Sequence, residues 1–167
     1  MASPLNRRHV HVPSWFVERA LGPDAQVARR AAFLAVDRNA HAGVAGEILA
    51  GREYLYVGDS AKNTACVYEV DLQQGVGLSL YLFTLLPSAA VIVSEAGKGL
   101  IEFVAASSQP YGGVIKSVQA AGFCALSESD CRQRTNVGEP PIRERLTVWE
   151  CLFEMDLEPP WERSKIQ

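Results

Sequence analysis

Residues 72–87 read LQQGVGLSLYLFTLLP, and the structure that this stretch adopts decides the fold of the chain. A strand-like run, ACVYEVD (65–71), precedes it, and another, AAVIVSE (89–95), follows it. The Gly-x-Gly sequence inside it fits either a tight turn between strands or a loop that holds a phosphate at the start of a helix. Because strand-like runs lie on both sides, we predict a hairpin turn that leads into a central strand over 77–86.

The composition is typical of one ordinary globular domain. The chain has 167 residues, of which 48% are hydrophobic and 21% are charged, and this suits a single core. We therefore expect a single domain over 1–167. The net charge is −3 and the basic residues are scattered, whereas nucleic-acid binding needs clustered Lys and Arg. This balance argues against nucleic acid as the partner.

Neither a membrane helix nor a secretory signal is expected. The longest apolar stretch, 78–93, is short for a membrane span and is interrupted by polar residues and Pro87. No apolar run of signal-peptide length follows the N-terminal arginines. The four cysteines contain no C-x-x-C pair, which is typical of free thiols in a reducing compartment. We expect a cytoplasmic protein.

The N-terminal part of the chain predicts helices. Ser14 and Asp24 are capping residues for helices over 14–22 and 24–39, and 41–51 extends the helical region despite its three glycines. The apolar face of the second helix would consist of Val27, Ala31, Leu34 and Ala35.

Val-, Ile- and Tyr-rich runs separated by turn signals then predict antiparallel strands. Glu69 and Asp71 alternate with apolar residues, which predicts a sheet with one wet face. Apolar residues at helical spacing return at 98–108, FCALSE (123–128) reads as a short strand, and 143–157 alternates like a long returning strand. The predicted fold is α+β: N-terminal helices and a mainly antiparallel sheet, with strands near 52–58, 65–72, 77–86, 89–95 and 143–157 and with two helices, 98–108 and 112–121, packed on one face.

Catalytic and metal-binding motifs are weak. The sequence contains neither a G-x-S-x-G elbow nor a P-loop. His9 and His11 would face the same way on a strand, as two metal ligands would, with His41 and Asp37 as further candidates. A surface pair near the N-terminus is the favoured alternative. We therefore predict no metal site and no catalytic residues.

One stretch resembles a known family. Strand, Gly-x-Gly turn, apolar segment and strand resemble the acetyl-CoA site of the GNAT N-acetyltransferases, and VIKSVQAAGF (114–123) and LFEMDL (152–157) resemble that family's later helix and closing strand. The resemblance covers 67–157. It implies an enzyme with acetyl-CoA as cofactor, a helix at 78–86 and a splayed gap between parallel strands at 65–72 and 89–95. The cofactor would be held by the backbone of Gln74, Gly75, Val76 and Gly77.

The sequence also departs from that family. Its loop is one residue shorter than the family pattern, and Val118 stands where the family has its tyrosine general acid. The acetyltransferase is therefore the alternative hypothesis, and the leading one involves no cofactor.

The leading hypothesis is a non-catalytic protein-binding protein of the immunity, adaptor or chaperone type. The acidic charge, the polar loop over 129–141 and the aromatic residue in the tail favour it. The predicted partner-binding residues are Arg132, Arg134, Glu139 and Trp161. Docking of the tail onto the core is the alternative for Trp161, and an apolar face containing Leu80, Tyr81 and Phe83 would allow a homodimer.

Overall fold

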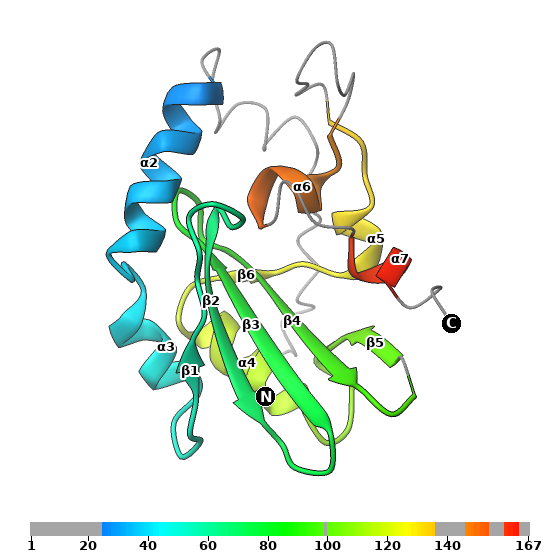
Figure 1. Cartoon of the computed structure of the whole chain (residues 1–167). Coiled ribbons are helices and arrows are strands. Elements are labelled where there is room, and N and C mark those ends of the chain that lie inside the picture. The colour runs from blue at the N-terminus through cyan, green and yellow to red at the C-terminus, as the bar shows by residue number, and fades with distance from the viewer. Residues whose placement is uncertain (1–24, 99, 136–145, 154–158, 164–167) are drawn as a thin grey trace, which may run out of the picture.

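The computed structural model describes residues 25–98, 100–135, 146–153 and 159–163; the helix predicted at 14–22 lies outside them. The described elements are, in chain order, α2 (Ala25–Asp37), α3 (Ala42–Ile48), β1 (Leu55–Tyr56), β2 (Ala65–Asp71), β3 (Val76–Phe83), β4 (Ser88–Glu95), β5 (Leu100–Phe103), α4 (Gly112–Ala120), β6 (Cys124–Ala125), α5 (Glu128–Cys131), α6 (Val148–Leu152) and α7 (Pro160–Arg163) (Figure 1).

The sheet is an antiparallel meander in which β1 to β5 lie side by side in chain order. β6 lies outside this path and pairs in parallel with the start of β4. The predicted α+β class is confirmed. The strands predicted near 65–72, 77–86 and 89–95, the short strand within 123–128 and the helix predicted over 112–121 are confirmed as well.

The turn between β2 and β3 is the predicted hairpin. Gln73, Gln74 and Gly75 have φ of 74°, 56° and 77°, all in the left-handed region that suits glycine best. The Leu72 N–H donates to the Val76 carbonyl at 2.9 Å, which closes the turn. Two glutamines with positive φ are uncommon, so this hairpin is held by the strands that it joins rather than by local preference.

Two predicted elements are wrong. Residues 98–108 do not form a helix, since β5 occupies their centre and pairs with β4 from Ile92 to Glu95. The local spacing of apolar residues there predicts a helix, whereas the pairing with β4 is a long-range contact that local spacing does not reveal. The strand predicted over 143–157 is also wrong at its centre, where α6 lies. Thr147 and Glu150 form a capping box, which starts a helix and ends the alternation.

Helix α2 confirms the predicted helix over 24–39, but its buried face differs from the predicted one. Val27 and Leu34 are 62% and 55% exposed, whereas Ala32 and Val36 are buried. Ala32 packs with sheet residues, and its small side chain lets the helix lie close to β2.

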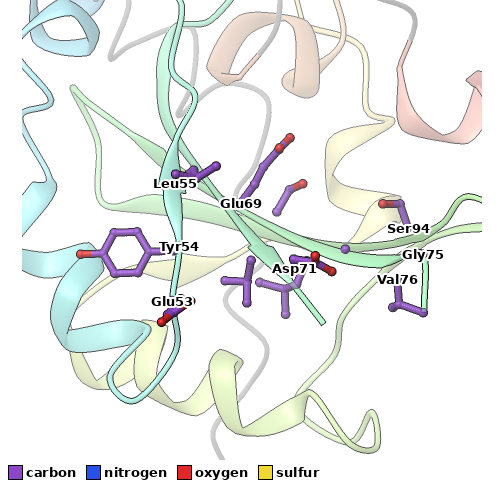
Figure 2. Close-up of a pocket in the computed structure, with 12 residues that line it drawn as sticks. Glu53, Tyr54, Leu55, Glu69, Asp71, Gly75, Val76 and Ser94 are labelled. Atoms are coloured by element: carbon purple, nitrogen blue, oxygen red, sulfur yellow. The ribbon is translucent and has the colours of Figure 1, made fainter. Parts of the chain in front are cut away.

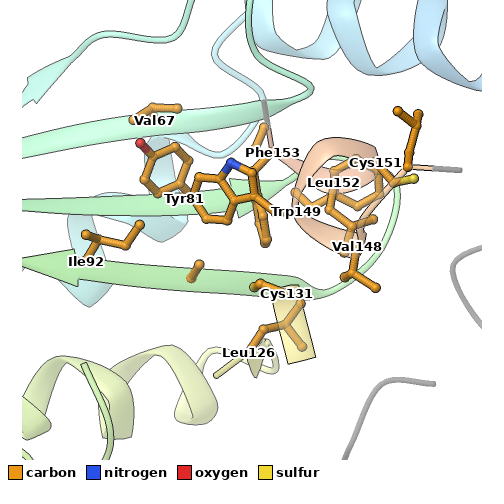
Figure 3. Close-up of a cluster of buried hydrophobic side chains, with 14 of the residues drawn as sticks. Val67, Tyr81, Ile92, Leu126, Cys131, Val148, Trp149, Cys151, Leu152 and Phe153 are labelled. Atoms are coloured by element: carbon orange, nitrogen blue, oxygen red, sulfur yellow. The ribbon is translucent and has the colours of Figure 1, made fainter. Parts of the chain in front are cut away.

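Alternate strand residues build two cores, one on each face of the sheet. The face that we call the α4 face carries Tyr68, Leu80 and Val91, and helices α3 and α4 pack on it. The opposite α6 face carries Val67 and Tyr81 and packs against α6 (Figure 3). The prediction of one wet face therefore holds only at one end of the sheet.

Candidate functional site

The Gly-x-Gly stretch does not form the start of a helix. β3 runs from Val76 to Phe83, through the residues for which the acetyltransferase resemblance requires a helix. β2 and β4, which should be splayed neighbours, are separated by β3. The stretch thus lacks both the helix and the gap that this cofactor site would use.

The backbone of residues 74–77 is engaged in the hairpin and the sheet. The Val76 N–H donates to the Gln73 carbonyl at 3.1 Å, and the Gly75 carbonyl accepts from the Ala96 N–H at 3.0 Å. Gly77 lies opposite Asp71 on one side and Ser94 on the other. These backbone groups stabilise the turn and join it to β4.

Trp161, one of the predicted partner-binding residues, lies in the core. Its side chain is 9% exposed and its ring lies 6.4 Å from those of Phe103 and Trp149. The Arg132 guanidinium covers the ring at 4.9 Å and also pairs with Glu128 at 2.6 Å. This arrangement matches the alternative weighed for Trp161, in which the C-terminal segment docks onto the core.

Two further predicted interaction residues are Arg134 and Glu139. Arg134 forms an isolated bridge with Thr147, next to α6, and Glu139 lies outside the described residues. The apolar residues considered for a dimer face are covered by the chain itself. Leu80, Tyr81 and Phe83 are 0%, 6% and 1% exposed.

The one described histidine has a structural position. The His41 Nε2 lies 3.0 Å from the Phe83 carbonyl, and because a carbonyl only accepts, Nε2 donates. The edge of the ring meets Phe123 at 5.3 Å between centroids. Within the described ranges, no three His, Cys, Asp or Glu residues gather as metal ligands, and His9 and His11 lie outside those ranges.

The part of the α6 face farthest from α6 is open. Glu69 and Asp71 are exposed and Ser79 is half-buried, whereas Val67, one pleat closer to α6, is buried. A hollow of about 690 Å³ borders this end of β1, β2 and β3 (Figure 2). The described residues that line it include three acids and no base; the acids are Glu53, Glu69 and Asp71.

Exposed apolar side chains gather at the neighbouring edge of the sheet. Among the described residues, six large hydrophobic side chains are exposed, and three of them, Tyr54, Leu55 and Val57, lie in or beside β1. Leu55 is the most exposed of the six, at 72%. It lies directly opposite Glu69 in the sheet, so the most exposed apolar side chain borders the acidic hollow. We call Glu53, Leu55, Val57, Glu69 and Asp71 the β1 surface.

No other described strand pairs with the outer edge of β1. β1 is one end of the strand order and β5 is the other. β5 packs against α7, and Phe103 contacts Trp161 there. β1 meets the described helices through its tyrosines: the Tyr56 hydroxyl donates to the Val36 carbonyl of α2, and Tyr54 lies beside Gly46 of α3. Leu55 and Val57, whose side chains alternate with these tyrosines, stay exposed.

Comparisons with known proteins identify no relative: no family model, no curated protein and no solved structure matches the chain. In the described part of the chain, none of the helices has the length and apolar character needed to cross a bilayer.

Sequence reasoning found part of this surface. The alternation in β2 placed Glu69 and Asp71 together on a wet face, as the structure shows. The sequence does not predict the exposure of Leu55, because an apolar residue in a short strand gives no local sign of whether another element covers it. The run of apolar residues over 54–57 is visible in the sequence, but a buried strand would show the same run, so the pattern does not indicate exposure.

Proposed function

We propose that this chain is a non-catalytic protein-binding protein of the immunity, adaptor or chaperone type, and that it binds its partner through the β1 surface. The observation that carries the proposal is the exposure of Leu55, together with Tyr54 and Val57, on an outer strand whose far edge pairs with no described strand. Apolar side chains grouped in this way, with a charged rim, are typical of protein interaction sites.

The chemistry of the surface suits a protein better than a small molecule. The apolar centre is exposed, and its neighbours Glu53 and Glu69 pair with no described cation. Small-molecule sites usually enclose the ligand in a concave apolar pocket, whereas here Tyr54 and Leu55 are exposed on an outer strand, at the border of a hollow that carries three acids.

We place this activity in the cytoplasm. All four cysteines are free thiols, and Cys66, Cys131 and Cys151 are buried. Free buried thiols are compatible with a reducing compartment.

The test is capture of a partner from extract of the source cells with matched variants. Leu55→Glu places a charge at the centre of the β1 surface, and Leu34→Glu is the control, since Leu34 is also exposed but lies on α2. We expect the wild type and Leu34→Glu to retain one specific protein and Leu55→Glu to lose it. Equal capture by all three, or loss only with Leu34→Glu, would refute the proposed site.

A further inference from the structure

The outer edge of β1 carries backbone groups with which no described strand pairs. The Val57 N–H donates to the Val67 carbonyl at 2.9 Å, and Leu55 lies opposite Glu69. In an antiparallel pair, alternate residues bond to the same neighbour, so the backbone groups of residues 55 and 57 point toward β2. Those of Tyr54 and Tyr56 consequently point away from the sheet.

The side chains on this edge alternate as well. Leu55 lies on the α6 face opposite Glu69, and by alternation Glu53 and Val57 share that face. The rings of Tyr54 and Tyr56 pack against Tyr68, which belongs to the α4 face. A strand added beside β1 would therefore meet an acid, a leucine and a valine at successive positions on the open face.

We propose that β1 accepts an extended peptide of the partner as an additional strand, and that this peptide carries apolar residues beside Leu55 and Val57 and a basic residue beside Glu53. This inference rests on the proposed function and names the chemistry of the partner. Strand addition supplies backbone hydrogen bonds, and alternate side chains supply the specificity.

Charge decides between this occupant and a second copy of the chain. Two β1 edges paired with one another would join two surfaces that each carry Glu53, Glu69 and Asp71 and, among the described residues that line the hollow, no base. Like charges placed across a strand pair destabilise the pairing, whereas opposite charges stabilise it. A basic peptide from a partner is thus favoured over a dimer.

The test uses the whole chain and a capped peptide, Arg-Thr-Val-Thr-Val-Thr-Arg, with binding followed by the NMR chemical shifts of backbone amides. The peptide places arginines and valines on one face in either strand direction. We expect shifts concentrated at residues 53–57 and 67–71. We also expect binding to weaken as salt is added, because exposed charge pairs are screened.

Two controls make the strand mode falsifiable. N-methylation of one set of alternate peptide residues removes the N–H groups that face β1, and methylation of the other set does not. Methylation of the set whose N–H groups face β1 should abolish binding, and methylation of the other set should preserve it. Replacing both arginines by glutamates should also abolish it, and Glu53→Gln should weaken binding of the basic peptide by about twofold to fivefold.

The outcomes separate this inference from the proposed function. If both methylated peptides bind equally, or if the shifts fall on α2, strand addition at β1 is wrong. If Leu55→Glu still abolishes partner capture in that case, the β1 surface remains the binding site and only the mode is refuted. A concentration-dependent dimer with the same shifts and no peptide binding would instead identify a second copy as the occupant.

Discussion

Tyr68 links the sheet to the helical segment at the residue scale. Its ring is fully buried, and its hydroxyl donates to the Asn39 Oδ1 between α2 and α3. The Tyr56 hydroxyl donates to the Val36 carbonyl of α2. Two phenol groups thus fix the helices to the strands that carry the β1 surface. Burial raises the pKa of both hydroxyls above the usual value of about 10, and the neighbouring Cys66 adds to the shift.

The shift predicts a loss of stability in alkali. A tyrosine whose pKa is raised by folding contributes stability that is complete below pH of about 10 and is lost as the pH rises above it, because the unfolded chain ionises first. Tyr68→Phe should cost about 1 kcal/mol at pH 7, since the hydrogen bond to Asn39 is lost. Above pH of about 10 the variant should lose stability less steeply than the wild type, by about 1.4 kcal/mol per pH unit.

Urea unfolding from pH 7 to 11 measures this effect. Tyr54→Phe is the matched control, because Tyr54 contacts the same ring but is 36% exposed. Parallel stability curves for the wild type and Tyr68→Phe across the whole range would show that Tyr68 does not ionise differently in the two states.

At the scale of elements, α6 is short and depends on its cap. It has five residues, yet it places the fully buried Trp149 against Tyr81 and Phe153 on the α6 face. The Glu150 N–H donates to the Thr147 Oγ1 at 3.3 Å, and the Thr147 N–H donates to the Glu150 carboxylate at 2.7 Å. So short a helix is marginal on its own, and the cap together with the packing of Trp149 holds it in place.

Thr147→Ala should therefore destabilise the protein by about 1–2 kcal/mol, since it removes the capping oxygen. Thr147→Ser keeps that oxygen and should restore most of the loss. Denaturant midpoints for the three proteins measure the difference. If the serine variant is as unstable as the alanine variant, the methyl group of Thr147 matters through packing, and the cap contributes little.

The same elements show what the sequence could predict. β2 carries an alternation of polar and apolar residues, and turn residues separate it from the apolar runs of β3 and β4. The strand-like runs on both sides of β3 predict it as a strand, although its own residues alternate poorly. The strand at Leu100–Phe103 exists because β4 offers an edge, and its local spacing favoured a helix. For α6, Thr147 and Glu150 are a local signal for the start of a helix, but the alternation around them predicts a strand.

At the scale of the whole molecule, the sheet has a core on each face, and the end of the α6 face farthest from α6 is open. Helices cover the α4 face and one end of the α6 face (Figure 1). The remaining end carries the acids and Leu55 (Figure 2). The sequence predicted a wet sheet face with Glu69 and Asp71. It did not predict which apolar residues stay exposed, because that depends on which elements reach the edge of the sheet.

The central claim is that the β1 surface binds a partner protein, and site-specific photo-crosslinking tests it most directly. A photoreactive phenylalanine analogue is placed at Leu55 in one protein and at Leu34 in another, and each is irradiated in extract of the source cells. We predict a discrete crosslinked partner with the probe at position 55 and none with the probe at position 34. A partner crosslinked from position 34 and not from position 55 would contradict the claim.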